Sequence, residues 1–171
     1  MRLTVALAVA VLLIPSAVAQ KKTAAPAFKT AEAKHFNVAE GVELTAEFTD
    51  YLYAELRSEL QKTKLFEEIV GDGEVVEQAD AAVSLIVEGS VIRFDKGSRV
   101  KESLIGLGVG RRSLSCEARV TRRSNGEVLA TINKQVRAST KWDEKELARN
   151  AAKDLAGEIK KALAKLPPPS A

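Results

Sequence analysis

Two apolar stripes with helical spacing lie near opposite ends of the chain, and each must be buried against another element. The first stripe falls within a helix predicted over 42–64 and comprises Leu44, Phe48, Tyr51, Leu52, Leu56 and Leu60. The second belongs to a helix that begins at Asp143 and comprises Leu147, Ala151, Leu155, Ile159 and Leu163. The segment between the helices must therefore supply an apolar surface that covers both stripes.

Short strands are expected on either side of the first helix. One is predicted over 29–38, and the other over 65–70, where Gly71-Asp72-Gly73 closes it with turn residues. A helix that returns directly into a strand indicates a β-α-β unit, which is right-handed if its two strands are parallel.

Longer strands follow beyond residue 80. An alternating apolar run continues past Gly89, where we expect a bulge. Two further alternating runs, 114–120 and 128–132, are joined by Asn125-Gly126, which favours a hairpin. The sequence thus predicts a single α+β domain in the order β-α-β-β-β-β-α, with two helices packed on a largely antiparallel sheet.

The second helix carries start signals of its own. Asp143 is the predicted N-cap, and Glu146 three residues later completes a capping box. Trp142 before the cap is expected to pack on Leu147 as a hydrophobic staple.

The first residues are typical of a secretory signal peptide. Arg2 precedes an apolar run, and small residues, Ala17-Val18-Ala19, stand at the cleavage site. We expect cleavage after Ala19 and a periplasmic or secreted protein without a transmembrane segment, with an uncleaved anchor as the alternative. No cysteine follows the cleavage site, so we expect no lipid. The predicted boundaries are a signal peptide over 1–19, a flexible tail over 20–28, a single domain over 29–165 and a Pro-rich tail over 166–171.

Catalytic and metal-binding side chains are scarce. The chain has one histidine and one cysteine, which excludes an internal disulfide and a His/Cys metal cluster. We interpret His35 as a surface or hydrogen-bonded residue, and Cys116 as a small buried residue on the apolar side of its strand. The glycine-rich run 106–110 lacks the residues of a phosphate-binding motif and is interpreted as a structural loop. We therefore expect no enzymatic activity and no cofactor.

Charge is the most informative asymmetry. Between Arg93 and Arg123 there are nine basic residues and three acidic ones. Part of this excess lies on the long connection over 95–112, here named the basic loop, and long connections are uncommon unless they are functional or disordered. The candidate partner-binding residues are Lys96, Arg99, Lys101, Arg111 and Arg112. A purely solvated loop is the alternative interpretation.

Several turn and core positions together resemble the Domain of Unknown Function 4410 family over about 29–163. They are Leu65-Phe66, Ala79-Asp80-Ala81, Gly106-Leu107-Gly108-Val109-Gly110 and Asn125-Gly126-Glu127-Val128-Leu129. The resemblance implies a bacterial envelope protein, often a lipoprotein, with no established catalytic or ligand residues. This chain departs from the lipoprotein members because it lacks a cysteine after its signal.

Three functions remain in competition. The leading hypothesis is a non-enzymatic binding or scaffolding module that uses the basic loop and the hairpin. Export excludes most nucleic acid, which leaves an acidic envelope protein, an anionic lipid headgroup or a cell-wall polymer as the partner. The alternatives are an unrecognised carboxylate-based hydrolase and an envelope subunit that self-assembles through an open sheet edge.

Overall fold

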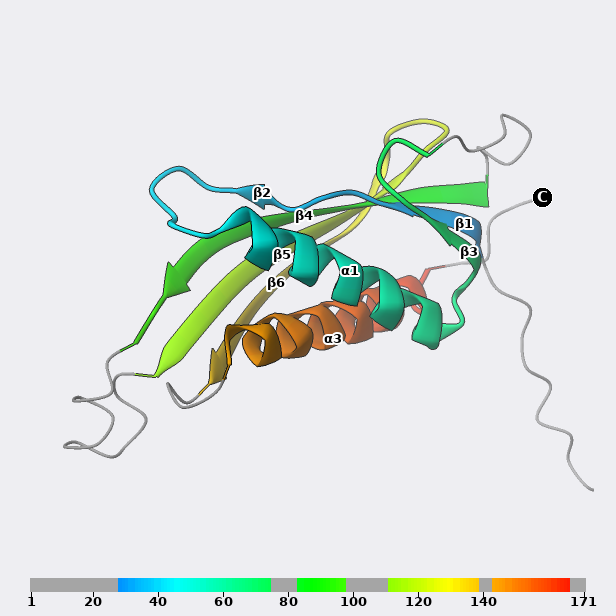
Figure 1. Cartoon of the computed structure of the whole chain (residues 1–171). Helices are drawn as coiled ribbons and strands as arrows, with labels where there is room; N and C mark the ends of the chain where they lie inside the picture. Colours follow the sequence, from blue (N-terminus) through cyan, green and yellow to red (C-terminus); the bar gives the residue numbers. More distant parts are fainter. Residues whose placement is uncertain (1–27, 75–82, 98–110, 139–142, 167–171) are drawn as a thin grey trace, which may run out of the picture.

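In the computed structural model, the described residues are 28–74, 83–97, 111–138 and 143–166. They form one mixed sheet and two helices (Figure 1). The strands are β1 (Phe28–Ala33), β2 (Asn37–Val38), β3 (Phe66–Val70), β4 (Ser84–Asp95), β5 (Arg112–Arg122) and β6 (Val128–Ala138), and the helices are α1 (Ala46–Thr63) and α3 (Glu144–Leu163). The predicted α+β class and element order are confirmed. The strand before α1 differs from the prediction in two ways: it starts at Phe28, which was assigned to the tail, and β1 and β2 divide it.

The sheet has the order β3-β1-β4-β5-β6. The short strand β2 follows β1 along β4 and pairs with a later part of that strand. The strand β1 runs parallel to both of its neighbours, β3 and β4, so that β1, α1 and β3 form the predicted β-α-β unit. The strands β4, β5 and β6 are antiparallel and make the longest ladders. The sheet is therefore antiparallel over most of its length, as predicted, with a parallel section around β1.

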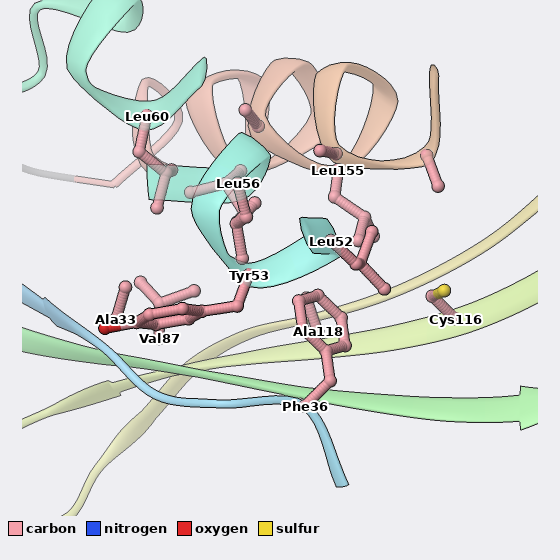
Figure 2. Packing of buried hydrophobic residues seen from close by; sticks show 14 of the residues in the cluster. Ala33, Phe36, Leu52, Tyr53, Leu56, Leu60, Val87, Cys116, Ala118 and Leu155 are labelled. Atoms are coloured by element: carbon pink, nitrogen blue, oxygen red, sulfur yellow. The ribbon is translucent and has the colours of Figure 1, made fainter. Parts of the chain in front are cut away.

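Both helices pack side by side on one face of the sheet (Figure 1). Leucines from α1 and α3 meet strand residues such as Val87, Cys116 and Ala118 in one core, and Figure 2 shows Leu52 and Leu155 facing each other within it. On the opposite face of β4, β5 and β6 the side chains are mostly polar, and no described helix covers them. We name this second surface the helix-free face.

The first helix begins at Ala46, later than the predicted start at residue 42. The hydroxyl of Thr45 accepts a hydrogen bond from the backbone N–H of Phe48 at 3.2 Å, which fixes Thr45 as the N-cap. Tyr53 is buried, and Tyr51 of the predicted stripe is half-buried and packs against the core. The helix ends where Lys64 adopts a left-handed conformation with φ of 56°.

The second helix agrees more closely with its prediction. Asp143 is the N-cap, and its carboxylate accepts a hydrogen bond from the backbone N–H of Lys145 at 3.3 Å. Trp142, the predicted staple residue, lies outside the described residues. Beside the predicted stripe, alanines at 148, 152 and 156 are also buried. Their small side chains allow α3 to lie close to α1 and to the sheet.

The predicted bulge after Gly89 is confirmed, since the register of β4 and β5 shifts between Val91 and Arg93. Gly89 itself pairs in register with Ala118. Gly89 also makes room for Phe36, because a Cβ atom on Gly89 would lie 2.3 Å from the Phe36 ring. Phe36 comes from the connection between β1 and β2, and its ring enters the core beside Leu52 (Figure 2).

Cys116 is buried on the core face, with 1% of its surface exposed, in agreement with the sequence interpretation. Burial raises the pKa of its thiol to about 12, so the reactive thiolate is nearly absent at neutral pH. We expect a thiol reagent to label Cys116 only when denaturant unfolds the chain. Cys116→Ala should retain the fold at a cost of about 1–2 kcal/mol in a denaturant titration. Labelling of the native protein at the rate of the unfolded chain would contradict this burial.

Candidate functional site

The predicted binding residues can be located only in part. Lys96, Arg111 and Arg112 are described, whereas Arg99 and Lys101 lie outside the described residues, as does the glycine-rich run 106–110. The end of β4 pairs with the start of β5, Asp95 opposite Ser113, which brings the three described residues to the same end of the sheet. The guanidinium of Arg112 donates to the backbone carbonyl of Lys96 at 3.3 Å and joins the two ends of the basic loop.

The basic side chains at this end are partly compensated by carboxylates. The ammonium of Lys96 lies 3.4 Å from Glu43, and the guanidinium of Arg112 lies 3.8 Å from Glu144 at the start of α3. Exposed ion pairs of this kind contribute about 0–1 kcal/mol and exchange readily. Arg111 is exposed and makes no ion pair with another described residue. This end of the sheet therefore carries both basic and acidic side chains, and its basic groups are held only by weak ion pairs or by none among the described residues.

A hollow of about 510 Å³ opens beside these residues, between the starts of the two helices and the end of β4. Its floor is apolar, with the rings of Phe48 and Phe94 5.8 Å apart. Glu43 and Glu144 stand on its walls, and each is held in one of the ion pairs described above.

The arginines of the predicted hairpin form ion pairs with carboxylates of the same domain. Arg122 pairs with Glu127 at 3.2 Å across the turn, and Arg119 lies 3.7 Å from Glu117 on the same strand. Arg123 donates to Glu32, a buried carboxylate on β1 that also accepts the backbone N–H of Gly73 at 3.3 Å. The hairpin is thereby tied to β1 and to the turn after β3. These contacts make its arginines less available to a partner than those at the opposite end of the strands.

A cluster around His35 was missed by the sequence analysis. The carboxylate of Asp72 accepts the backbone N–H of His35 at 3.1 Å and lies 3.2 Å from its ring Nδ1. The same ring stacks on Tyr53, with centroids 3.9 Å apart, and the Tyr53 hydroxyl accepts the backbone N–H of Asp72 at 2.9 Å. This agrees with the interpretation of His35 as a hydrogen-bonded residue. The turn Gly71-Asp72-Gly73 was the available signal, because an aspartate between glycines often caps a neighbouring N–H.

The contact with Asp72 gives a pH-dependent prediction. The backbone N–H of His35 is the main reason that the pKa of Asp72 lies below its usual value, and nearby charge on His35 and Lys34 adds to the effect. A carboxyl whose pKa is lower in the folded state stabilises the fold above its unfolded pKa of about 3.9, and that contribution is lost as the pH falls through the folded pKa.

Asp72→Asn should therefore lower the free energy of unfolding at pH 7 by about 0.5–1 kcal/mol, a small loss because the side chain is well exposed. The difference from the unaltered protein should shrink below about pH 4 in urea titrations. Asp154→Asn, at an exposed position on α3, is the control and should have little effect. An equal loss at pH 7 and pH 3 would contradict the assignment.

Among the described residues, neither helix is long and apolar enough to cross a bilayer. Those residues also contain no group of three or more His, Cys, Asp or Glu side chains arranged to hold a metal ion.

The fold is similar to that of several solved structures. One is the PelC dodecamer from Paraburkholderia phytofirmans, with a TM-score of 0.57, 8% identity and coverage of 78% of this chain and 89% of that one. Another is protein XCC0632 from Xanthomonas campestris, with a TM-score of 0.56, 12% identity and coverage of 84% and 91%. A third is the hypothetical protein CT253 from Chlamydia trachomatis, with a TM-score of 0.54, 9% identity and coverage of 81% and 99%. At these identities the likeness is one of fold.

No match is found among proteins with curated descriptions. A family model, described as a domain of unknown function, matches residues 19–140, which is more than half of the chain and includes both the hairpin and the basic loop. The chain therefore belongs to the DUF4410 family.

Proposed function

We propose that this protein is an exported, non-enzymatic binding module of the bacterial envelope that holds an anionic component at the end of the sheet where β4 meets β5. The observation that carries the proposal is the convergence of Lys96, Arg111 and Arg112, with Arg93 close by on β4. Two of these residues, Arg93 and Arg111, are exposed and have no ion pair to another described residue. Long-range attraction between such charges and an anionic partner accelerates association and gives it specificity.

The test compares two variants with equal changes in net charge. One replaces Lys96, Arg99, Lys101, Arg111 and Arg112 by Gln. The control replaces five exposed lysines on the helices or directly after them, Lys62, Lys153, Lys160, Lys161 and Lys165, by Gln. Binding to polyglutamate, polygalacturonate and phosphatidylglycerol vesicles is measured from low to high salt.

We expect the first variant to bind at least one of these anions about tenfold more weakly than the unaltered protein, because several exposed charges each contribute some tenths of a kcal/mol. The control should bind normally. Added salt should weaken binding steeply, since the Debye length falls from about 10 Å at 0.1 M to about 3 Å at 1 M. Equal losses in both variants would mean that only net charge matters, and the proposal would be wrong.

The proposed location has a test of its own. Because Ala17-Val18-Ala19 precedes Gln20 and no cysteine follows, we expect the protein recovered from the periplasm to begin at Gln20 and to carry no lipid. Intact mass spectrometry of the periplasmic fraction measures both features. A chain that retains Met1, or a mass that includes acyl chains, would contradict export as a free protein.

A self-assembling subunit is the second candidate function. The strand β6 is one of the two outer strands of the described sheet, and an open edge strand can pair with another copy. The PelC structure of similar fold is a dodecamer, which favours the same possibility for this chain. Light scattering after size-exclusion chromatography tests it: a mass several times that of one chain supports assembly, and a monomer at all concentrations excludes it.

A further inference from the structure

The register of the three antiparallel strands places a set of donors on the helix-free face. Arg93 on β4 pairs with Ser115 on β5, which pairs with Gln135 on β6, so these three residues form one row across the sheet. The next row contains Asp95, Ser113 and Arg137. Residues that lie opposite each other in an antiparallel ladder point to the same face, so both rows share the helix-free face.

Hydrogen bonds direct the charged groups of the second row in different directions. The guanidinium of Arg137 donates to the side-chain oxygen of Gln135 at 3.2 Å, which draws it toward the row that contains Ser115 and Arg93. The carboxylate of Asp95 instead accepts the backbone N–H of Gly97 at 2.8 Å. No ion pair joins Asp95 to Arg137 among the described contacts. Arg137 is thus held beside the first row without a carboxylate partner.

The spacing of the strands allows both arginines to reach one anion. Neighbouring strands lie about 4.8 Å apart, so Arg93 on β4 and residues on β6 are separated by about 10 Å at the backbone. Ser115 lies between them, and its short side chain leaves space above β5. A carboxylate placed there can accept charge-assisted hydrogen bonds from two guanidinium groups, with the serine hydroxyl as a further donor.

The other charged residues of this face already have partners. Glu88 on β4 pairs with Lys34 at 3.2 Å, and Glu117 lies 3.7 Å from Arg119. Arg93 and Arg137 are therefore the basic groups of this face that have no carboxylate partner among the described residues. An incoming anion does not have to displace an internal ion pair to bind them.

The remainder of the helix-free face favours a hydroxyl-rich ligand over a membrane. Uncharged hydrogen-bonding side chains continue along the strands from the two rows: Ser90, Thr121, Thr131 and Asn133. Among the described residues, the exposed large apolar side chains are Val38, Ile92 and Val128, which are few for insertion into lipid.

We infer that the helix-free face binds an acidic polysaccharide, with Arg93, Ser115 and Arg137 holding one of its carboxylates and Gln135 positioning Arg137. This inference rests on the proposed function and names the ligand class and the residues that bind it. The chain of the polysaccharide lies across β4, β5 and β6, where the polar side chains meet its hydroxyl groups.

The test uses the folded protein and polygalacturonate. The site variant carries Arg93→Gln and Arg137→Gln, and its matched control carries Arg122→Gln and Arg149→Gln, which remove two arginines that already have carboxylate partners and do not lie on the helix-free face. Loss of two charge-assisted contacts should weaken binding of the polymer by about tenfold or more in the site variant. The control should lose less than about threefold. Equal thermal midpoints for the site variant and the unaltered protein exclude a folding defect.

Binding of other ligands shows whether the protein recognises an acidic polysaccharide, any polysaccharide or an anionic membrane. Dextran, a neutral polysaccharide, should bind far more weakly than polygalacturonate, and phosphatidylglycerol vesicles should bind no better than neutral vesicles. Equal binding of dextran, binding of the vesicles alone, or unchanged binding by the site variant would each overturn the inference. If the site variant binds normally while the variant of the basic loop does not, only the inference fails. If neither variant differs from its control, the proposed function fails as well.

Discussion

Leu155→Asp is expected to abolish soluble folding. Leu155 is fully buried in α3 and faces Leu52 of α1 in the core between the helices (Figure 2). A buried carboxylate without a partner costs several kcal/mol, which is comparable with the entire stability of a domain, about 5–15 kcal/mol. Phe48→Asp on α1 should have the same effect for the same reason.

Circular dichroism and denaturant titration measure the outcome, and Lys153→Asp at an exposed position of the same helix is the control. The control should change stability by less than about 0.5 kcal/mol. If Leu155→Asp unfolds at the same denaturant concentration as the unaltered protein, the assigned core face of α3 is wrong.

Gly89→Ala is expected to have the second largest effect, although it adds a single methyl group. That methyl group would stand 2.3 Å from the Phe36 ring, a distance that forces the ring or the strand to move. Overpacking of this kind costs about 1–3 kcal/mol. We expect a loss near the upper end of that range, because the ring lies between the sheet and α1 in the core.

A second substitution makes the explanation specific. Phe36→Leu removes part of the ring, so the double variant should lose less stability than the sum of the two single losses. Gly157→Ala on α3 is the matched control, because nothing lies within 4 Å of the added Cβ atom and alanine favours a helix. Additive losses at positions 36 and 89 would show that their side chains do not compete for space.

Local periodicity accounts for the parts of the fold that were predicted. The stripe on α3, the cap at Asp143 and the turn at Asn125-Gly126 depend on residues that are near each other in sequence. The burial of Tyr53, which lies outside the predicted stripe, and the role of Gly89 depend on which distant segment packs against them. In particular, the space that Gly89 leaves is understood only once Phe36 is known to fill it.

In the candidate site, too, only the features that depend on local sequence could be predicted. The excess of basic residues was visible in the sequence, whereas the carboxylates that compensate Lys96 and Arg112 come from the starts of the two helices. Arg137 was not a candidate, because it lies beyond the basic segment and reaches the site only through the register of β5 and β6. Strand register is set by tertiary pairing, so a count of charges along the chain misses this residue.

The most direct test of binding at the helix-free face is a nuclear magnetic resonance titration of the folded protein with polygalacturonate, in which backbone amides and arginine side-chain N–H groups are followed together. We expect the largest shifts at Arg93, Ser115, Gln135 and Arg137, with smaller ones at Lys96 and Arg111, and little change along α1 and α3. Shifts concentrated on the helices or in the hollow beside Phe48, or no shifts at saturating polymer, would contradict it.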